Sequence, residues 1–258
     1  MTIILKTMLY GIFRDTHTLV LTIFFPIALL IGLGLYYDDP AYSERLVVGV
    51  LTTNVLFGAT MVTAFNVMAQ RNRGIYKLLR VTPFSTTAFI CSMTGARTVL
   101  TLLVSSSIII IGILIFGITV SLPGIALMLL IMLAGTVCFT AVGFIAANLS
   151  KDESNVNMIS NLISFPMLFT SEAFYSMQNA PDWIHIIARL QPFHYFVKAM
   201  SVALHPNGPI QDIWISFAAL VGFAILCLLI AVLTFRWDTE GTVIGRKSSR
   251  KKLHEHEA

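Results

Sequence analysis

The sequence predicts an all-α integral membrane protein with six membrane-spanning helices. Hydrophobic residues make up 56% of its 258 residues and charged residues only 12%, and its mean hydropathy is +0.81. A soluble domain carries about 25% charged residues, so this chain has too few polar side chains to cover a soluble surface. Its long charge-free stretches approach the roughly 20 residues that a helix needs to cross a bilayer. This composition excludes a soluble enzyme, a nucleic-acid-binding module and a disordered protein.

Charge-free stretches locate the six spans. They cover residues 18–37, 46–69, 98–118, 125–149, 155–170 and 213–235. A tight turn is expected at Ser121-Leu122-Pro123-Gly124, from its Pro-Gly pair, before the fourth span. Residues 1–240 should therefore form one transmembrane domain, followed by a basic hydrophilic cytoplasmic tail at residues 241–258.

The distribution of Lys and Arg predicts the orientation of the chain. Fourteen of the seventeen fall on one side of the six-span arrangement, including Lys6 and Arg14 before the first span. Because basic loops remain in the cytoplasm, both termini should be cytoplasmic. The net charge of +4 then reflects cytoplasmic loops and contact with anionic lipid, and we expect no nucleic-acid partner.

The sequence offers no catalytic or metal-binding constellation. Cys91, Cys138 and Cys227 stand apart in apolar surroundings and are expected to be small packing residues. The stretch 241–248 resembles a phosphate loop, but it has three residues between its glycines where the motif has four. If the protein moves a substrate uphill with ATP, the ATPase must therefore be a separate subunit.

The loop between the second and third spans is the first informative segment. A short helix is expected over residues 75–81, with its apolar side chains on one face and its cations elsewhere. The helix could lie on the membrane surface, or it could dock a cytoplasmic partner through an apolar face with a cationic rim. The candidate docking residues are Arg71, Arg73, Gly74, Lys77, Leu78, Arg80 and Pro83.

The second informative segment lies between the fifth and sixth spans. Pro181 and Asp182 favour a helix start, and Trp183, Ile187 and Leu190 then recur at helical spacing. A helix this short cannot span the bilayer. We expect an amphipathic or re-entrant segment at the outer interface, where Trp is favoured.

In this order and topology, the two segments resemble the type-2 ABC exporter permeases, or ABC-2 family, over nearly the whole chain. The loop matches at Asn72-Arg73-Gly74, with Asn72 in place of an acidic residue, and at Thr82-Pro83. The later pattern matches at Ser171, Phe174, Tyr175, Pro181, Trp183, Pro192 and Tyr195, and departs at Glu172, Ser176 and Gln191. The opening Arg14-Asp15 and Phe25-Pro26 is also similar to the family.

The resemblance implies the membrane subunit of an ATP-driven exporter of an amphipathic compound, either a drug, an antibiotic or a lipid-like molecule. It implies a dimer with a second copy or a paralogue in the cell membrane, plasma or bacterial inner. It also implies an ABC ATP-binding partner that carries the ATP and Mg, with no cofactor in this chain. Lys6 and Arg14 would add an N-terminal interfacial contact.

Polar residues of the fifth span and the segment after it are candidates for the transport pathway. Asn155, Asn157 and Asn161 could line a pathway near the dimer axis or form interhelical hydrogen bonds. Glu172 could be a solvated residue at the outer interface, facing Arg189 or His185. It could also be an outer-gate residue that favours cationic or zwitterionic substrates, with Phe174 and Tyr175 as an apolar constriction.

Two other functions remain open on the sequence. One is an ion-gradient-driven carrier or channel, although such carriers usually bury carboxylates at the midplane and these spans hold none deep inside. The other is a membrane-anchored assembly or immunity protein that transports nothing. Co-purification with an ATPase would exclude the first, and ATP-driven transport in vesicles would exclude the second.

Overall fold

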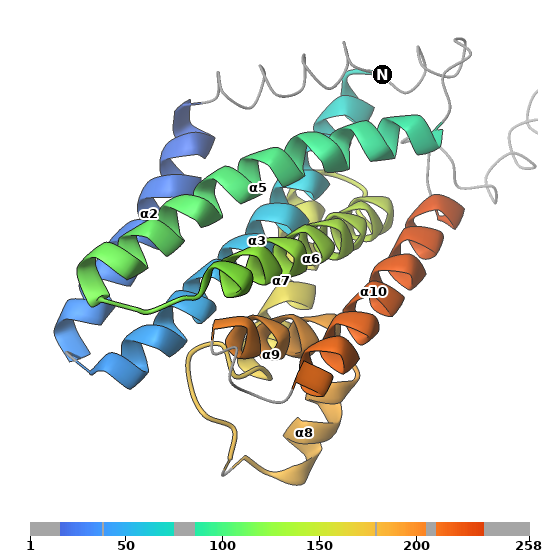
Figure 1. Cartoon of the computed structure of the whole chain (residues 1–258). Helices are drawn as coiled ribbons and strands as arrows, with labels where there is room; N and C mark the ends of the chain where they lie inside the picture. Colours follow the sequence, from blue (N-terminus) through green and yellow to red (C-terminus); the bar gives the residue numbers. More distant parts are fainter. Residues whose placement is uncertain (1–15, 38, 75–85, 179, 205–209, 235–258) are drawn as a thin grey trace, which may run out of the picture.

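A computed structural model describes residues 16–37, 39–74, 86–178, 180–204 and 210–234. Its described residues form eight helices and no strand, which confirms the all-α prediction. The helices are α2 (Thr16–Tyr37), α3 (Pro40–Asn72), α5 (Thr86–Phe116), α6 (Leu122–Leu149), α7 (Glu153–Phe169), α8 (Asp182–Arg189), α9 (Pro192–Leu204) and α10 (Ile210–Leu233). Figure 1 shows the long helices packed as a bundle, with α8 at its foot.

Six of these helices overlap the six expected spans, but α5 begins at Thr86, well before the expected start of its span at Thr98. By length and composition, the segments Tyr42–Asn72, Leu122–Leu149 and Ile213–Leu233 can cross a membrane, and Phe24–Tyr37 and Thr101–Phe116 are shorter apolar helices. The structure therefore supports a membrane-embedded helical protein, and the count of six spans stays a prediction. α3 has 33 residues, which is about 50 Å of helix against a hydrocarbon core of about 30 Å.

The bundle has two ends, which we name by what lies there. At the basic end, α3 ends near Arg71 and Arg73, α6 ends, and α7 begins. At the α8 end, α2 connects to α3 and α5 to α6, and α8 lies there too (Figure 1). The described start of the first informative segment, residues 71–74, and helix α8 therefore lie at opposite ends.

Helix caps explain two of the boundaries. Ser121 caps α6 by accepting a hydrogen bond from the Gly124 amide at 3.2 Å. Pro123 thus lies in the first turn of α6, where its missing N–H has no partner to lose. The predicted tight turn at Pro123-Gly124 was wrong for this reason. Asp152 caps α7 by accepting from the Asn155 amide at 2.8 Å.

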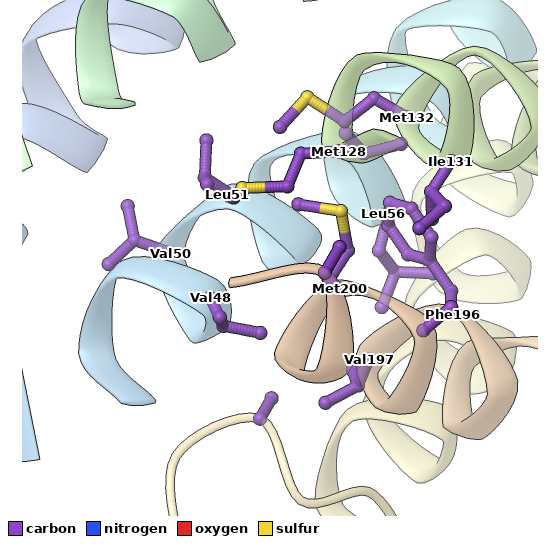
Figure 2. Close-up of a cluster of buried hydrophobic side chains, with 14 of the residues drawn as sticks. Val48, Val50, Leu51, Leu56, Met128, Ile131, Met132, Phe196, Val197 and Met200 are labelled. Carbon is purple, nitrogen blue, oxygen red and sulfur yellow. The ribbon is translucent and has the colours of Figure 1, made fainter. Parts of the chain in front are cut away.

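The core lies where α3, α6 and α9 meet. Figure 2 shows buried side chains converging from these three helices, among them Leu51, Met132 and Phe196. A Cβ at Gly143 of α6 would come within 2.9 Å of the Thr63 Cβ, so glycine lets α3 and α6 approach closely. Cβ atoms at Gly32 and Gly222 would meet nothing within 4 Å. Of these three glycines, only Gly143 lies where an added Cβ would meet a neighbouring helix.

α9 was not expected. Its 13 residues extend about 20 Å, too little to cross a bilayer, yet most of them are buried. Phe193 and Phe196 meet Phe139 of α6 with ring centroids 5.9 and 5.7 Å apart. α9 therefore begins inside the bundle, against Phe139, and ends at the α8 end, where the Ala203 carbonyl lies beside Gly124 at the start of α6.

Candidate functional site

Arg71 ties three helices together at the basic end. Its side chain is only 5% exposed, and its guanidinium donates to the Ala147 carbonyl and to Asn148 Oδ1, both at 3.2 Å. Asn148 Nδ2 in turn donates to the Ala231 carbonyl and to Thr234 Oγ1, again at 3.2 Å. We call Arg71, Asn148 and these α10 acceptors the three-helix network, because it connects the ends of α3, α6 and α10.

The chain leaves α3 at the predicted place. Gly74 has φ +70°, a left-handed conformation that glycine adopts without strain. Its amide donates to the Arg71 carbonyl at 3.0 Å, as the residue after a helix C-cap commonly does. Arg73 beside it is exposed. Arg73 is thus exposed at the end of α3, whereas Arg71, which the sequence placed among the docking residues, is buried in the bundle.

A second contact joins α3 to α7. Asn72 Nδ2 donates to Glu153 Oε1 at 3.3 Å, so the end of α3 also touches the first turn of α7. The other predicted residues of the basic end lie outside the described residues. These are Lys6, Arg14, Lys77, Leu78, Arg80 and Pro83.

The three asparagines of α7 do not act alike. Asn155 Nδ2 donates to Asp152 Oδ2 at 3.1 Å, which occupies its side chain in the helix cap. Asn161 Nδ2 donates to Asn157 Oδ1 at 3.0 Å on the same face. Met158 and Leu162 are exposed beside this pair, Leu162 to 70%. The exposed face of α7 is thus an apolar surface interrupted by one amide pair.

Gln191 caps α7 from a distance. Its Nε2 atom donates to the Thr170 and Met167 carbonyls at 3.1 and 3.2 Å and to Thr170 Oγ1 at 2.7 Å. Carbonyls at a helix C-terminus lack partners within the helix, and Gln191 supplies them. The Tyr195 hydroxyl donates to the Arg189 carbonyl at 3.0 Å, at the end of α8. The α8–α9 corner is therefore fastened to the end of α7.

The segment after α7 is held against α3. A Cβ added to Gly49 would overlap the Ala173 carbonyl and come within 3.0 Å of the Phe174 ring, so only glycine allows this approach. Phe174 packs against the buried core, whereas Glu172 and Tyr175 are exposed. Burial of part of the Tyr175 side chain raises the pKa of its phenol. The predicted gate residues therefore line the α8 end of α3.

His194, at the start of α9, interacts electrostatically with four charged or titratable side chains of the α8 end. Burial lowers the pKa of its imidazole, and Lys198, Arg189 and His185 lower it further, while Glu172 opposes them. Among the contacts of the described residues, Glu172 forms no ion pair with Arg189 or His185. Its electrostatic partner is His194, which the sequence did not single out.

α8 has the amphipathic character that was predicted. It follows Pro181 and carries Asp182 in its first turn and Arg189 in its last, both favourable to the helix dipole. Ala188 is buried, whereas Trp183 is 58% exposed and Ile187 and Leu190 are exposed as well. An apolar face turned away from the protein suits the membrane interface.

Sequence reasoning missed several contacts between distant segments. The Cys138 and Cys227 side chains, on α6 and α10, interact with each other, and both thiols are free. Asn148 is a polar residue near the end of an otherwise apolar span, and that isolation is a usable signal for a buried hydrogen-bond partner. Gln191 and Gly49 give no comparable signal.

Comparison with known proteins identifies the chain's relatives at the family level. A family model described as ABC-2 type transporter matches residues 1–205. The match includes α2 to α9 and leaves α10 outside it. A search of curated proteins found no significant match.

Proposed function

The chain belongs to the ABC-2 type transporter family, and on that premise we propose that it exports an amphipathic compound from the cytoplasm or the inner leaflet. Members of this family are transmembrane subunits that work with an ABC ATP-binding subunit. The substrate would be a drug, an antibiotic or a lipid-like molecule. ATP and Mg would bind to the separate partner.

The main support for the proposal is the set of hydrogen bonds that connects the end of α3 to other helices at the basic end. α3 stops at a left-handed glycine, Gly74, and the basic segment of residues 73–83 begins there. Directly before this segment, Arg71 donates hydrogen bonds to α6, and Asn72 contacts α7. Asn148, which accepts from Arg71, donates in turn to α10. A partner that pulled on the basic segment would therefore act on four helices through neighbouring residues.

The proposed topology places the basic end in the cytoplasm. α2, α3, α5, α6, α7 and α10 would be the six spans, because they overlap the six charge-free stretches. The positive-inside rule orients them. α8 would then lie at the outer interface, with Trp183 and Ile187 among the headgroups.

The proposed dimer uses the exposed face of α7. Asn157 and Asn161 satisfy each other there, beside the exposed Leu162 and the stacked rings of Phe165 and Phe169. A polar pair on an apolar membrane face is costly toward lipid, and a second copy or a pathway would shelter it. Glu172 and Tyr175 would stand at the exit.

Charge reversal tests the docking assignment. In the triple variant Arg73→Glu, Lys77→Glu and Arg80→Glu, the cationic rim of the docking segment becomes anionic, so like charges oppose the partner. We expect normal membrane insertion and loss of co-purification with the ATP-binding subunit, measured by pull-down from detergent extracts.

The matched control reverses two exposed cations at the opposite end, with Arg189→Glu and Lys198→Glu. This control should retain the ATP-binding subunit. A triple variant that keeps the subunit at wild-type stoichiometry would contradict the docking assignment.

A further inference from the structure

A cavity at the α8 end is lined by charged and polar side chains that neither helix packing nor the docking proposal explains. It has a volume of about 380 Å³, within the range of roughly 300–1,000 Å³ that is typical of small-molecule sites. Its walls come from the start of α3, the segment after α7 and the last turns of α9. The lining includes Glu44, Arg45, Glu172, Tyr175, Gln178 and Ser201.

The lining combines opposite charges with neutral hydrogen-bonding groups. Glu44 and Glu172 provide carboxylates, and Arg45 provides one guanidinium. The Tyr175 phenol has an ordinary pKa near 10, which burial raises further, so it is neutral at pH 7, and its ring can face a cation. Carboxylates bind ammonium groups, and a guanidinium binds phosphate or carboxylate through paired donors. The set therefore matches a head that carries both an ammonium and an acidic group.

Several contacts within the chain hold the cavity walls. Gly49 lets the Ala173 backbone rest directly on α3, and the Ser171 hydroxyl donates to the Leu168 carbonyl at 2.7 Å. Gln191 holds the end of α7 from the α8–α9 corner. Glu172 lies between these anchors, so binding would require little reordering of the chain, which favours affinity.

The position of α8 indicates the depth of the cavity in the membrane. The exposed Trp183, Ile187 and Leu190 place α8 at the level of the headgroups, and the cavity lies at the same end of the bundle. A ligand there can keep its head in the cavity and its tail in the acyl region. We propose that this cavity binds the zwitterionic head of an amphiphile, with its ammonium toward Glu172 and its acidic group toward Arg45.

The inference deepens the proposed function by naming the head group of a ligand at the exit side. The same chemistry could come from a lipid of the outer leaflet or from the exported compound. Binding is measured on the permease alone, without ATP. A failure of binding is therefore distinguishable from a failure of ATP-driven export.

The test uses the purified full-length chain and native mass spectrometry with three probes. Dioctanoyl phosphatidylethanolamine carries an ammonium and a phosphate, dioctanoyl phosphatidylglycerol lacks the ammonium, and dodecylamine lacks the phosphate. Wild-type protein should prefer phosphatidylethanolamine. Glu172→Gln should lower the affinity for phosphatidylethanolamine and for dodecylamine by about tenfold or more, because a charge-assisted hydrogen bond is lost. Arg45→Gln should lower the affinity for phosphatidylethanolamine and leave the affinity for dodecylamine unchanged.

Asp182→Asn is the matched control, since it removes one exposed carboxylate at the same end, outside the cavity. It should bind like wild type. Equal affinity of the wild type for the two phospholipids would overturn the proposal. So would unchanged phosphatidylethanolamine binding in a Glu172→Gln protein whose melting temperature matches the wild type.

A second arm distinguishes the two sources. Proteoliposomes that contain the ATP-binding subunit receive a fluorescent short-chain phosphatidylethanolamine in the leaflet on the basic side. ATP-dependent transfer to the opposite leaflet, reduced by Glu172→Gln, would identify the ligand as cargo. Selective binding without transfer would identify it as a resident lipid, and either result supports the zwitterion site.

Discussion

Asn148 uses its amide oxygen and both donor hydrogens in the three-helix network. Its amide oxygen accepts from Arg71, and its nitrogen donates to Ala231 and Thr234. An asparagine side chain has two donors and one carbonyl oxygen, so no other residue of similar size can replace all three contacts. Arg71 is nearly fully buried, and a buried charge is costly when it loses a partner.

We predict that Asn148→Ala destabilises the protein. Arg71 would lose a charge-assisted partner, at a cost of roughly 1.5–3 kcal/mol, so the melting temperature in detergent should fall by several degrees. Asn72→Ala is the control, because its contact with Glu153 is exposed and such contacts contribute little. If both variants melted at the same temperature, the three-helix network would not stabilise the fold.

His194 should make stability depend on pH. Its pKa is lowered in the folded state, first by burial, whereas an unfolded histidine titrates near pH 6.5. Between these two values the unfolded chain binds more protons, so stability is lost as the pH falls below about 6.5. His194→Gln should show a smaller drop in melting temperature between pH 7.5 and 5.0 than the wild type. Above about pH 8 the imidazole is neutral in both states, so a difference in slope there would contradict the assignment.

At the scale of elements, α9 depends on one position in α6. A Cβ added to Gly135 would come within 2.6 Å of the Phe196 ring, closer than real Cβ contacts. Phe196 is fully buried and touches Phe139 and Phe193, so the ring has little room to move. A glycine inside α6 therefore decides whether α9 can enter the bundle.

We predict that Gly135→Ala destabilises the protein by about 1–3 kcal/mol, the usual cost of overpacking a core. Phe196→Leu added to Gly135→Ala should recover part of the loss, because the smaller side chain leaves space for the new methyl. Thermal melting of the two single variants and the double variant gives the coupling between the sites.

Gly222→Ala provides the comparison within the same bundle. A Cβ there meets nothing within 4 Å, and alanine favours a helix over glycine. This variant should melt at or above the wild-type temperature. Equal losses at Gly135 and Gly222 would show that the Phe196 contact is not the cause.

At the scale of the whole molecule, the exposed apolar surface is uneven. α10 exposes Leu229 and Leu233, as a helix in contact with lipid should. α7 exposes Leu162 and Phe169 but also the hydrogen-bonded pair of Asn157 and Asn161. Of these two faces, only that of α7 combines apolar exposure with a polar pair.

We predict that α7 faces its counterpart in a dimer. Single cysteines at Asn161 and Leu162, placed in a chain whose native cysteines are replaced by alanine, should form crosslinked dimers on oxidation in membranes. Leu229→Cys on α10 is the control and should remain monomeric. Crosslinks on α10 with none on α7 would move the interface away from α7.

Local properties of the sequence determined the helices and their places. Membrane insertion and helix hydrogen bonds act within one segment, so charge-free stretches located α2, α3, α6 and α10 to within a few residues or one or two turns. Pro181, Asp182 and the spacing of Trp183 and Ile187 located α8 in the same way. Gly74 marked the end of α3 because only its own backbone had to adopt φ +70°.

Tertiary structure decided what those helices do to one another. Arg71 looked like a loop cation, but its partners lie 76 and 77 residues away, and no local pattern encodes them. α9 begins at Pro192, shortly after the end of α8. Its burial depends on the space that Gly135 leaves on α6. The cavity beside Glu172 likewise needs α3, the segment after α7 and α9 together. Such contacts depend on the shapes of surfaces distant in sequence, and packing decides them only when the helices assemble.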